Sequence, residues 1–510
     1  MNDTVVFHGG TVLTMEHRAA TAVAISNGRV LAVGDDDLLL AHPDARPVDL
    51  AGRTLSPGFI DAHNHLSIAA LHPMWADLSA VHNIDGLAAA LHAHARANPD
   101  TAWIRGCMWT DLGHGFQPRR ADLDALGLDR PIVVAHYSLH QGVVCSRGLA
   151  ELGIGRTTPD PSGGQIARDA HGEPDGLLVE RAWSEAHARS VAAYADPDRW
   201  ADHVETRARQ LLADGITCIH DAACSPEAEA MYAMLHRNGR LPISVVAMPH
   251  PAALLQPLDR GRLDGPPTGE GDEMLRVGAV KLFADGGVLP ALDAHVGTYH
   301  VQVGELFDGL GEQITAVTER DFAVAVHAIG NGALRCVLEA FRGVRAPRMR
   351  VEHACLAGRD ELAEMAAIGA IAVVQPGFVH HMGAEVEQAR FDDATWLPFG
   401  DLDRAGVTIA ASSDDPCTFH QPLRTAARGV NRVTAHGNVL DIAQGLSYER
   451  WLEAYTLGAA TAAGQEHERG RIAPGLRADL VVIDGPLDAD APPRVAQTWL
   501  AGECVFDAQW

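Results

Sequence analysis

The chain of 510 residues is nearly devoid of lysine. Lys and Arg together number 40, and Lys281 is the single lysine among them. Lysine is normally one of the commonest residues in proteins. The exception lies in 276-RVGAVKLFADGGV-288, an apolar run that is typical of a buried strand. A charged side chain kept only in such a place calls for a chemical reason.

Other absences restrict the class of protein. The start MNDTVVFHGGTVLTMEHRAA has no basic segment followed by an apolar core, so we expect no signal peptide. No run of about 18 apolar residues predicts a membrane span. The eight cysteines form no CxxC pair, as in reduced cytosolic proteins. The net charge of −26 argues against nucleic acid or an anionic membrane as partner. We therefore expect a cytoplasmic protein that acts on a small molecule.

The two ends of the chain have the same character. Short apolar strands alternate with turns over residues 1–56, and again over residues 466–510. Asn27-Gly28 between two strand-like runs is a hairpin signal. The pattern predicts one small sheet domain built from both termini.

The middle of the chain, residues 57–465, alternates β-branched runs with Ala- and Leu-rich helical stretches. Eight such alternations predict a parallel (β/α)8 barrel, an α/β fold. Residues 66–197 are too many for one helical crossover and are expected to form an insertion over the barrel mouth. The predicted strands are 58–63, 215–222, 241–248, 276–285, 322–330, 349–354, 371–378 and 407–415.

Metal-capable side chains end four of these strands, on the face where barrel active sites lie. His63 and His65 are two residues apart, so their imidazoles should face one point, as a metal requires. His327, His353 and Asp414 end three later strands. Each alone is more typical of a hydrogen-bonded core or turn residue, but their occurrence in barrel order predicts a metal site.

Lys281 fits such a site only without its charge. Burial lowers the pKa of an amine, and a neutral amine can react with carbon dioxide to give an anionic carbamate that bridges two metals. Arginine cannot form such a carbamate, because the pKa of its guanidinium is too high for it to lose its charge. Two alternatives stay open for Lys281. In one it forms a Schiff base with a substrate, as in barrel aldolases, and in the other it is a chance survivor of an Arg-rich composition.

Several motifs, in order, resemble those of the amidohydrolase superfamily, in particular the amidohydrolase 3 group of YtcJ-like proteins and N-substituted formamide deformylases. They are PGFIDAHNHL, TTPDPSGGQIARDAHGEPDGLLVERA, VKLFADGG, VHAIGNGAL, VEHA, SSDDP and AYTLGAATAAG…GRIAPGLRADLVVID. The resemblance implies that His63, His65 and Asp414 hold one metal and that His327 and His353 hold the second. It implies Lys281 as the carbamylated bridge, and a β-sandwich for the domain built from both ends.

The same resemblance implies a mechanism. Two divalent ions, with zinc expected, would activate a hydroxide that attacks an amide carbonyl, while Asp414 carries the proton to the leaving nitrogen. Two departures affect the substrate region. Ser138-Leu139-His140 replaces the group's Asp-Gly-His, and Cys145-Ser146 replaces Asn-Ser. We expect substrate contacts from four residues, each of which is equally well explained as structural: His140, Gln375, Trp109 and His220.

The predicted function is therefore hydrolysis of a C–N bond, in an amide such as a formamide or N-acyl compound. One alternative is a deaminase of the same superfamily with a single metal, acting on an amidine-like ring carbon. Another is a non-catalytic scaffold, which the retention of all six ligand residues disfavours. The resemblance is also compatible with a homodimer.

Overall fold

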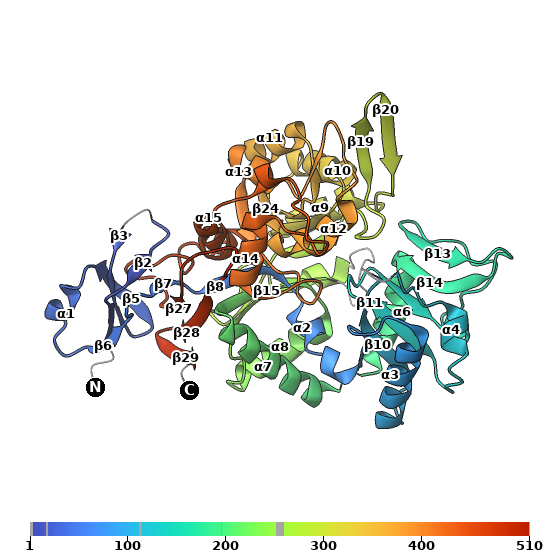
Figure 1. Cartoon of the computed structure of the whole chain (residues 1–510), viewed down its shortest axis with the longest axis horizontal. Helices are drawn as coiled ribbons and strands as arrows, with labels where there is room; N and C mark the ends of the chain where they lie inside the picture. The colour runs from blue at the N-terminus through green and yellow to red at the C-terminus, as the bar shows by residue number, and fades with distance from the viewer. Residues whose placement is uncertain (1–3, 17–18, 112–114, 195, 251–259, 509–510) are drawn as a thin grey trace.

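The computed structural model describes residues 4–16, 19–111, 115–194, 196–250 and 260–508. Three parts follow one another across the molecule (Figure 1). A domain of short strands at one end contains both termini, a barrel lies in the centre, and a mixed sheet with its helices lies at the other end. Among the described residues, no helix is long and apolar enough to cross a membrane.

The central part is the predicted barrel. The strands β8, β15 and β16 pair in parallel, and β18, β21, β22, β24 and β26 form a second parallel run, with β26 against β8. Each predicted strand position holds a strand, which confirms the fold class. The eight strands are β8 Phe59–Asn64, β15 Ile216–Cys224, β16 Ser244–Pro249, β18 Val280–Phe283, β21 Val324–Ala328, β22 Met349–His353, β24 Ile371–Val374 and β26 Thr408–Ala411.

The fourth strand differs from the prediction, which had one strand over 276–285. The structure has β17 Leu275–Val277, which pairs with β16, and β18, which pairs with β21. The break falls at Gly278, whose N–H donates to the Ala247 carbonyl at 2.7 Å. A Cβ at this position would lie 2.8 Å from Val246 Cγ1. The backbone thus passes close to its neighbour at Gly278, where the chain changes from pairing with β16 to pairing with β21.

Capped helices return the chain between barrel strands. The helix α7, Pro197–Ala213, begins after Asp196, whose carboxylate accepts from the Arg199 N–H. The helix α8, Pro226–Arg237, begins after Ser225 in the same way. Both carry proline in their first turn, where no N–H is needed. Trp200, Val204 and Leu211 of α7 are buried in the barrel core.

Both ends of the chain share one sheet, as predicted. The strand β7, Thr54–Pro57, pairs antiparallel with β27, Leu480–Asp484. It belongs to a six-stranded sheet, and a four-stranded sheet packs near it around Phe7, Leu55 and Trp499. The domain limits at 56/57 and 465/466 remain predictions. The other strands are β1 Val5–His8, β2 Thr11–Leu13, β3 Ala19–Ala20, β4 Ala22–Ser26, β5 Arg29–Gly34, β6 Arg46–Asp49, β28 Arg494–Leu500 and β29 Glu503–Asp507.

A second sheet lies within the segment predicted as an insertion. Its six strands follow the order β13-β14-β12-β11-β10-β9. The helix α6, Arg181–Ala192, packs on this sheet and also borders the central cavity. The limits at 66 and 197 remain a prediction. The helix α3, Ile84–Ala97, lies between the first two of its strands in the sequence, and the strands are β9 Ala76–Asp77, β10 Ile104–Trp109, β11 Ile132–His136, β12 Gln141–Val144, β13 Gly164–Arg168 and β14 Pro174–Glu180.

A buried ion pair near β27 allows a test of this packing. The Asp479 carboxylate accepts from Arg477 Nε at 2.8 Å and from the Ala501 N–H at 2.8 Å. Both side chains of the pair are almost fully buried, at 4% and 3% exposed. Arg477 also pairs with Glu273 at 3.1 Å, but the buried Arg469, whose Nη1 lies 3.6 Å from Asp479 Oδ2, loses its carboxylate in Asp479→Ala. We therefore expect a loss of about 3–5 kcal/mol. The shift of the urea unfolding midpoint measures it.

Asp484→Ala is the matched control. Its carboxylate is 50% exposed and pairs with an Arg494 side chain that is 85% exposed. We expect a change below about 0.5 kcal/mol for this variant. Equal midpoints for the two variants would contradict a structural role for the buried pair.

Candidate metal centre

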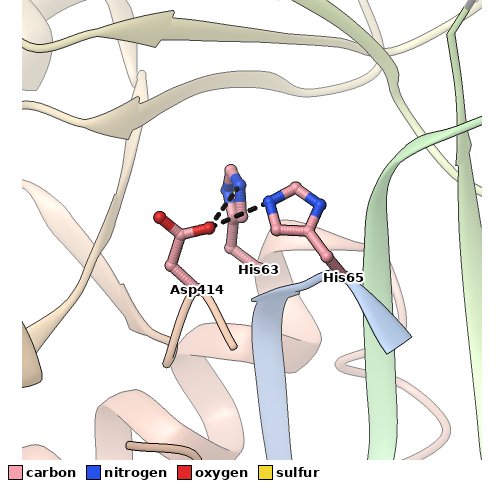
Figure 2. Close-up of side chains that lie close together, drawn as sticks. All are labelled: His63, His65 and Asp414. Atoms are coloured by element: carbon pink, nitrogen blue, oxygen red, sulfur yellow. Dashed lines mark ion pairs between the residues drawn. The ribbon is translucent and has the colours of Figure 1, made fainter. Parts of the chain in front are cut away.

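Two histidines and one aspartate converge where the barrel closes (Figure 2). His63 lies near the end of β8, and His65 directly precedes α2, Leu66–Ala69. The Asp414 Oδ1 atom lies 3.5 Å from His63 Nε2 and 2.9 Å from His65 Nε2. One ligand atom from each of the three lies within 4.8 Å of the others. Two imidazole nitrogens and a carboxylate oxygen are a typical zinc donor set.

Asp414 reaches this position through a loop rather than by strand alternation. The strand β26 ends at Ala411, and Asp414 has a positive φ of 57°. The alternation that would place it on the face of Ala410 and Ser412 therefore does not extend to it. Its N–H instead donates to the His63 carbonyl at 2.8 Å, which fixes the loop on β8. A left-handed backbone at a non-glycine residue is costly and is found preferentially at functional sites.

Of the four histidines predicted as metal ligands, three have one ring nitrogen held by a hydrogen-bond acceptor of the protein. Since each of these acceptors is an oxygen, Nδ1 carries the proton and Nε2 presents its lone pair. Metal-binding histidines in proteins are commonly oriented in this way. The pairs are His63 Nδ1 with Glu352 Oε2 at 2.5 Å, His65 Nδ1 with the Ala222 carbonyl at 2.8 Å, and His353 Nδ1 with Gln375 Oε1 at 2.9 Å.

The contact between His65 and Asp414 fits a bound cation. With Nδ1 donating to a carbonyl, neutral His65 turns a lone pair toward a carboxylate oxygen only 2.9 Å away. Two acceptors at this distance require a proton or a metal ion between them. Burial opposes the charged imidazole, but the hydrogen bond to Asp414 outweighs it and raises the pKa of His65. Burial raises the pKa of Asp414, yet the nearby His63 and His65 lower it further, so the carboxylate is ionised.

Lys281 and the two remaining histidines extend this cluster. Lys281 Nζ lies 3.2 Å from His63 Nε2 and is almost fully buried. Burial lowers the pKa of Lys281 to about 8, so a sizeable neutral fraction exists near neutral pH. The His353 ring lies 4.8 Å from that of His63 and 4.6 Å from that of His327, centroid to centroid. All six predicted ligand residues line one cavity of about 290 Å³.

His327 differs from the other histidines in the cluster. Its Nε2 is buried without a hydrogen-bond partner and lies 3.7 Å from Asp285 Oδ1. Burial raises the pKa of Asp285 to about 7, although its carboxylate accepts from the backbone N–H groups of Ala291, Ile329 and Gly330. Burial also places the pKa of His327 well below its usual value, so this ring is neutral. A neutral imidazole is the form that binds a metal ion.

Among the four predicted substrate contacts, His140 alone lines the cavity. Its ring lies 5.3 Å from that of His327, and its Nδ1 pairs with the buried Glu180 Oε2 at 2.6 Å. Gln375 lies behind His353 and orients that ring, so its role is indirect.

His220 and Trp109 are placed elsewhere than expected. His220 is fully buried in the barrel, with Nδ1 at 3.1 Å from Arg350 Nη1. Trp109 packs in the core of the inserted sheet, where its Nε1–H donates to the Phe116 carbonyl at 2.9 Å. The sequence shows that both residues follow apolar runs but not which side of the strand faces the cavity.

Glu352 supports the centre without having been predicted from the sequence. Its carboxylate holds His63 and receives two hydrogen bonds from Arg350, at 2.8 and 3.1 Å. Both charged side chains are buried on the apolar strand β22. The signal was available, because Arg350 and Glu352 are two residues apart and so share one strand face. His187, which borders the cavity from the insertion, and Glu180, which holds His140, carried no comparable signal.

Comparisons with known proteins agree with this geometry. Residues 46–506 match the model of the amidohydrolase family. N-substituted formamide deformylase of Arthrobacter pascens is 31% identical, over 96% of this chain and 94% of that protein. The putative amidohydrolase YtcJ of Bacillus subtilis is 29% identical, over 98% and 99%. An uncharacterised metal-dependent hydrolase from Pyrococcus furiosus superimposes with a TM-score of 0.72 at 25% identity, over 95% of this chain and 99% of that one. The chain therefore belongs to the amidohydrolase family and is a metal-dependent hydrolase of carbon–nitrogen bonds other than peptide bonds.

Proposed function

We propose that this protein hydrolyses the amide bond of a small molecule, such as a formamide or another N-acyl compound, to an amine and an acid. Two divalent ions, with zinc expected, would be held by six residues around a carbamate on Lys281. The observation that carries the proposal is the contact between His65 Nε2 and Asp414 Oδ1 at 2.9 Å, beside Lys281, whose pKa burial lowers to about 8. The proposed ligands are His63, His65, Lys281, His327, His353 and Asp414.

Bound divalent ions would supply polarisation of the amide carbonyl and a lowered pKa for water, from about 15.7 to about 7. The side chains of the protein supply the remaining steps. Ionised Asp414 accepts the proton of the attacking water and returns it to the leaving nitrogen. The formamide deformylase to which the chain is similar supports an amide as substrate.

His140 is suited to hold the substrate from the other side of the cavity. Glu180 fixes its Nδ1, and the same carboxylate accepts from the Val288 N–H at 2.7 Å. The Nε2 atom of His140 is therefore left with a lone pair that can accept a hydrogen bond from an N–H of the substrate. This arrangement ties the ring to the inserted sheet and to the loop after β18 at once.

Lys281 would become an anion by reaction of its neutral amine with carbon dioxide. The nitrogen forms a bond to carbon, the amine releases one proton to water, and the product carries two carboxylate-type oxygens. Burial supports this step because it lowers the pKa of Lys281 to about 8. The centre of the Phe283 ring lies 4.9 Å from Lys281 Nζ, so the amine has an apolar neighbour on that side.

The mononuclear deaminase remains a second candidate for a specific reason. Among the described residues, the set of ligand atoms that lie within 4.8 Å of one another is limited to His63, His65 and Asp414. Three ligands suffice for one ion. Such an enzyme needs no carbamate, so the state of Lys281 separates the two candidates. Homodimer formation and a cytoplasmic location remain predictions.

Metal content provides the first test. We expect about two divalent ions per chain after dialysis and fewer in His65→Ala, measured by elemental analysis. The exposed His467, whose side chain is 83% accessible, gives a matched control as His467→Ala, with unchanged content. One ion per chain in an active preparation would contradict the binuclear centre.

The pH dependence of metal binding follows from His65. Asp414 raises the pKa of His65 above its usual value of 6.5. The imidazolium therefore persists to higher pH, and a metal ion must displace its proton. We expect the apparent zinc affinity to fall as the pH decreases through that raised pKa, with proton release measurable by calorimetry in buffers of different ionisation enthalpy. Affinity independent of pH between 6 and 8 would contradict His65 as a ligand.

The carbamate can be tested at its carbon atom. After exchange with 13C-bicarbonate, the metal-loaded protein should show a 13C carbamate resonance that is lost in Lys281→Arg. No other side chain is a lysine, so the assignment is unambiguous. Lys281→Ala should lose activity on the order of 100-fold or more, since even residues that support ligands reach that range. Formate or acetate should partly restore it. Full activity in Lys281→Arg would contradict the carbamate, because arginine keeps the charge but cannot form it.

A further inference from the structure

A histidine of the insertion borders the cavity without a role in the chemistry described above. His187 lies on α6 and is buried, at 5% exposed. The other residues of α6 that line the cavity are apolar, namely Ala188, Val191 and Ala192. Among the described residues, His187 is therefore the polar side chain that α6 presents to the cavity.

The tautomer of His187 is fixed by a buried arginine. Arg105 Nη2 lies 3.4 Å from His187 Nδ1, and Arg105 Nη1 lies 2.5 Å from Ser190 Oγ. A guanidinium only donates hydrogen bonds, so His187 Nδ1 must accept and the proton of the ring must lie on Nε2. Burial and the charge of Arg105 both place the pKa of His187 well below its usual value. His187 thus offers the cavity a neutral N–H donor.

Arg105 itself is a buried cation with neutral partners. It is fully buried, and its guanidinium carbon lies 4.2 Å from the centre of the Trp75 ring. Among the described residues, no carboxylate lies within 4.0 Å of it. Burial lowers the pKa of Arg105 only to about 10, so it stays charged at neutral pH. A buried positive charge without a counterion is unfavourable, and an anion in the adjacent cavity would be stabilised by it.

The two histidines that the insertion places at the cavity, His140 and His187, are held by side chains of opposite charge. Glu180, an anion, holds His140, whereas Arg105, a cation, holds His187. Lys281 is the sole Lys or Arg among the described residues that line the cavity. An anionic group of the substrate thus has one favourable place outside the metal centre, next to His187.

We propose that His187 determines specificity by donating its Nε2–H to a carboxylate of the substrate, with Arg105 behind the ring strengthening that hydrogen bond. The substrates are then amides that carry a carboxylate at the end remote from the scissile bond. The proposal rests on the proposed function for the identity of that bond. His187 acts on recognition and takes no part in bond cleavage.

A matched series of substrates tests this proposal. N-formyl derivatives of ω-amino acids with two to six carbons are compared with n-alkylformamides of the same chain length. At the best chain length we expect the carboxylate to lower KM in the wild type. His187→Leu should remove this preference, raising KM for the acid roughly 10- to 100-fold, the range of a hydrogen bond to a charged group. KM for the alkylformamide and both kcat values should change little.

His187→Gln is the conservative variant, because its amide nitrogen can take the place of Nε2. We expect it to keep most of the preference for the acid. If KM for the acid rises equally in His187→Leu and His187→Gln, the role of His187 is structural and the proposal is overturned. The same holds if His187→Leu raises KM equally for the acid and the alkylformamide. The proposal would also be overturned if, in the wild type, the alkylformamide and the acid had the same KM at every chain length.

Binding separates this proposal from the proposed function. In an Asp414→Asn background, the affinity for each compound is measured by quenching of tryptophan fluorescence, since Trp200 borders the cavity. Tighter binding of the acid that His187→Leu abolishes supports the role of His187, whether or not the wild type cleaves any amide. If the wild type hydrolyses none of the compounds in the series, that result instead counts against the proposed function.

Discussion

The seam between the first and last strands of the barrel is the constraint on which the rest of the site depends. The strands β8 and β26 lie at the edges of two separate hydrogen-bonded sheets, and side chains join them. Asp61 of β8 accepts from the Ser413 N–H at 2.9 Å and from the Ser413 hydroxyl at 2.5 Å. The same seam carries His63 and Asp414. The hydrogen bonds that hold this loop across the seam thus also set the Asp414 carboxylate against the imidazoles of His63 and His65.

Charge around this seam is arranged by burial. Arg350 and Glu352 form a pair inside the barrel that holds His63 from behind, so its outer nitrogen faces the cluster. Lys281 lies on the other side of the same ring. Burial of an ammonium is unfavourable, and the lowered pKa of Lys281 expresses this cost. The arrangement favours any process that removes the positive charge, such as proton loss or conversion to an anion.

The insertion contributes the side of the cavity that the barrel lacks. The helix α6 lines the cavity with apolar side chains and His187, and Glu180 at the end of β14 pairs with His140. Glu180 has a φ of 53°, and Leu139 beside His140 has a φ of 63°. Leu139 lines the cavity, as do Asp414 and His353, which also have a positive φ. His140 thus lies in a loop of the insertion, whereas four of the six proposed ligands lie on barrel strands, namely His63, Lys281, His327 and His353.

The sequence by itself determined the barrel, the sheet shared by both ends and the six residues that meet in the cavity. Local patterns suffice for these, because strand ends in barrel order have one common face and the lysine stands alone in its composition. Only the tertiary structure decided that the fourth strand breaks at Gly278, that Gln375 holds the His353 ring and that Trp109 and His220 lie away from the cavity. It also decided which partners hold His140 and His187. Those pairings join residues 40 and 82 positions apart, across a sheet whose register no local pattern specifies.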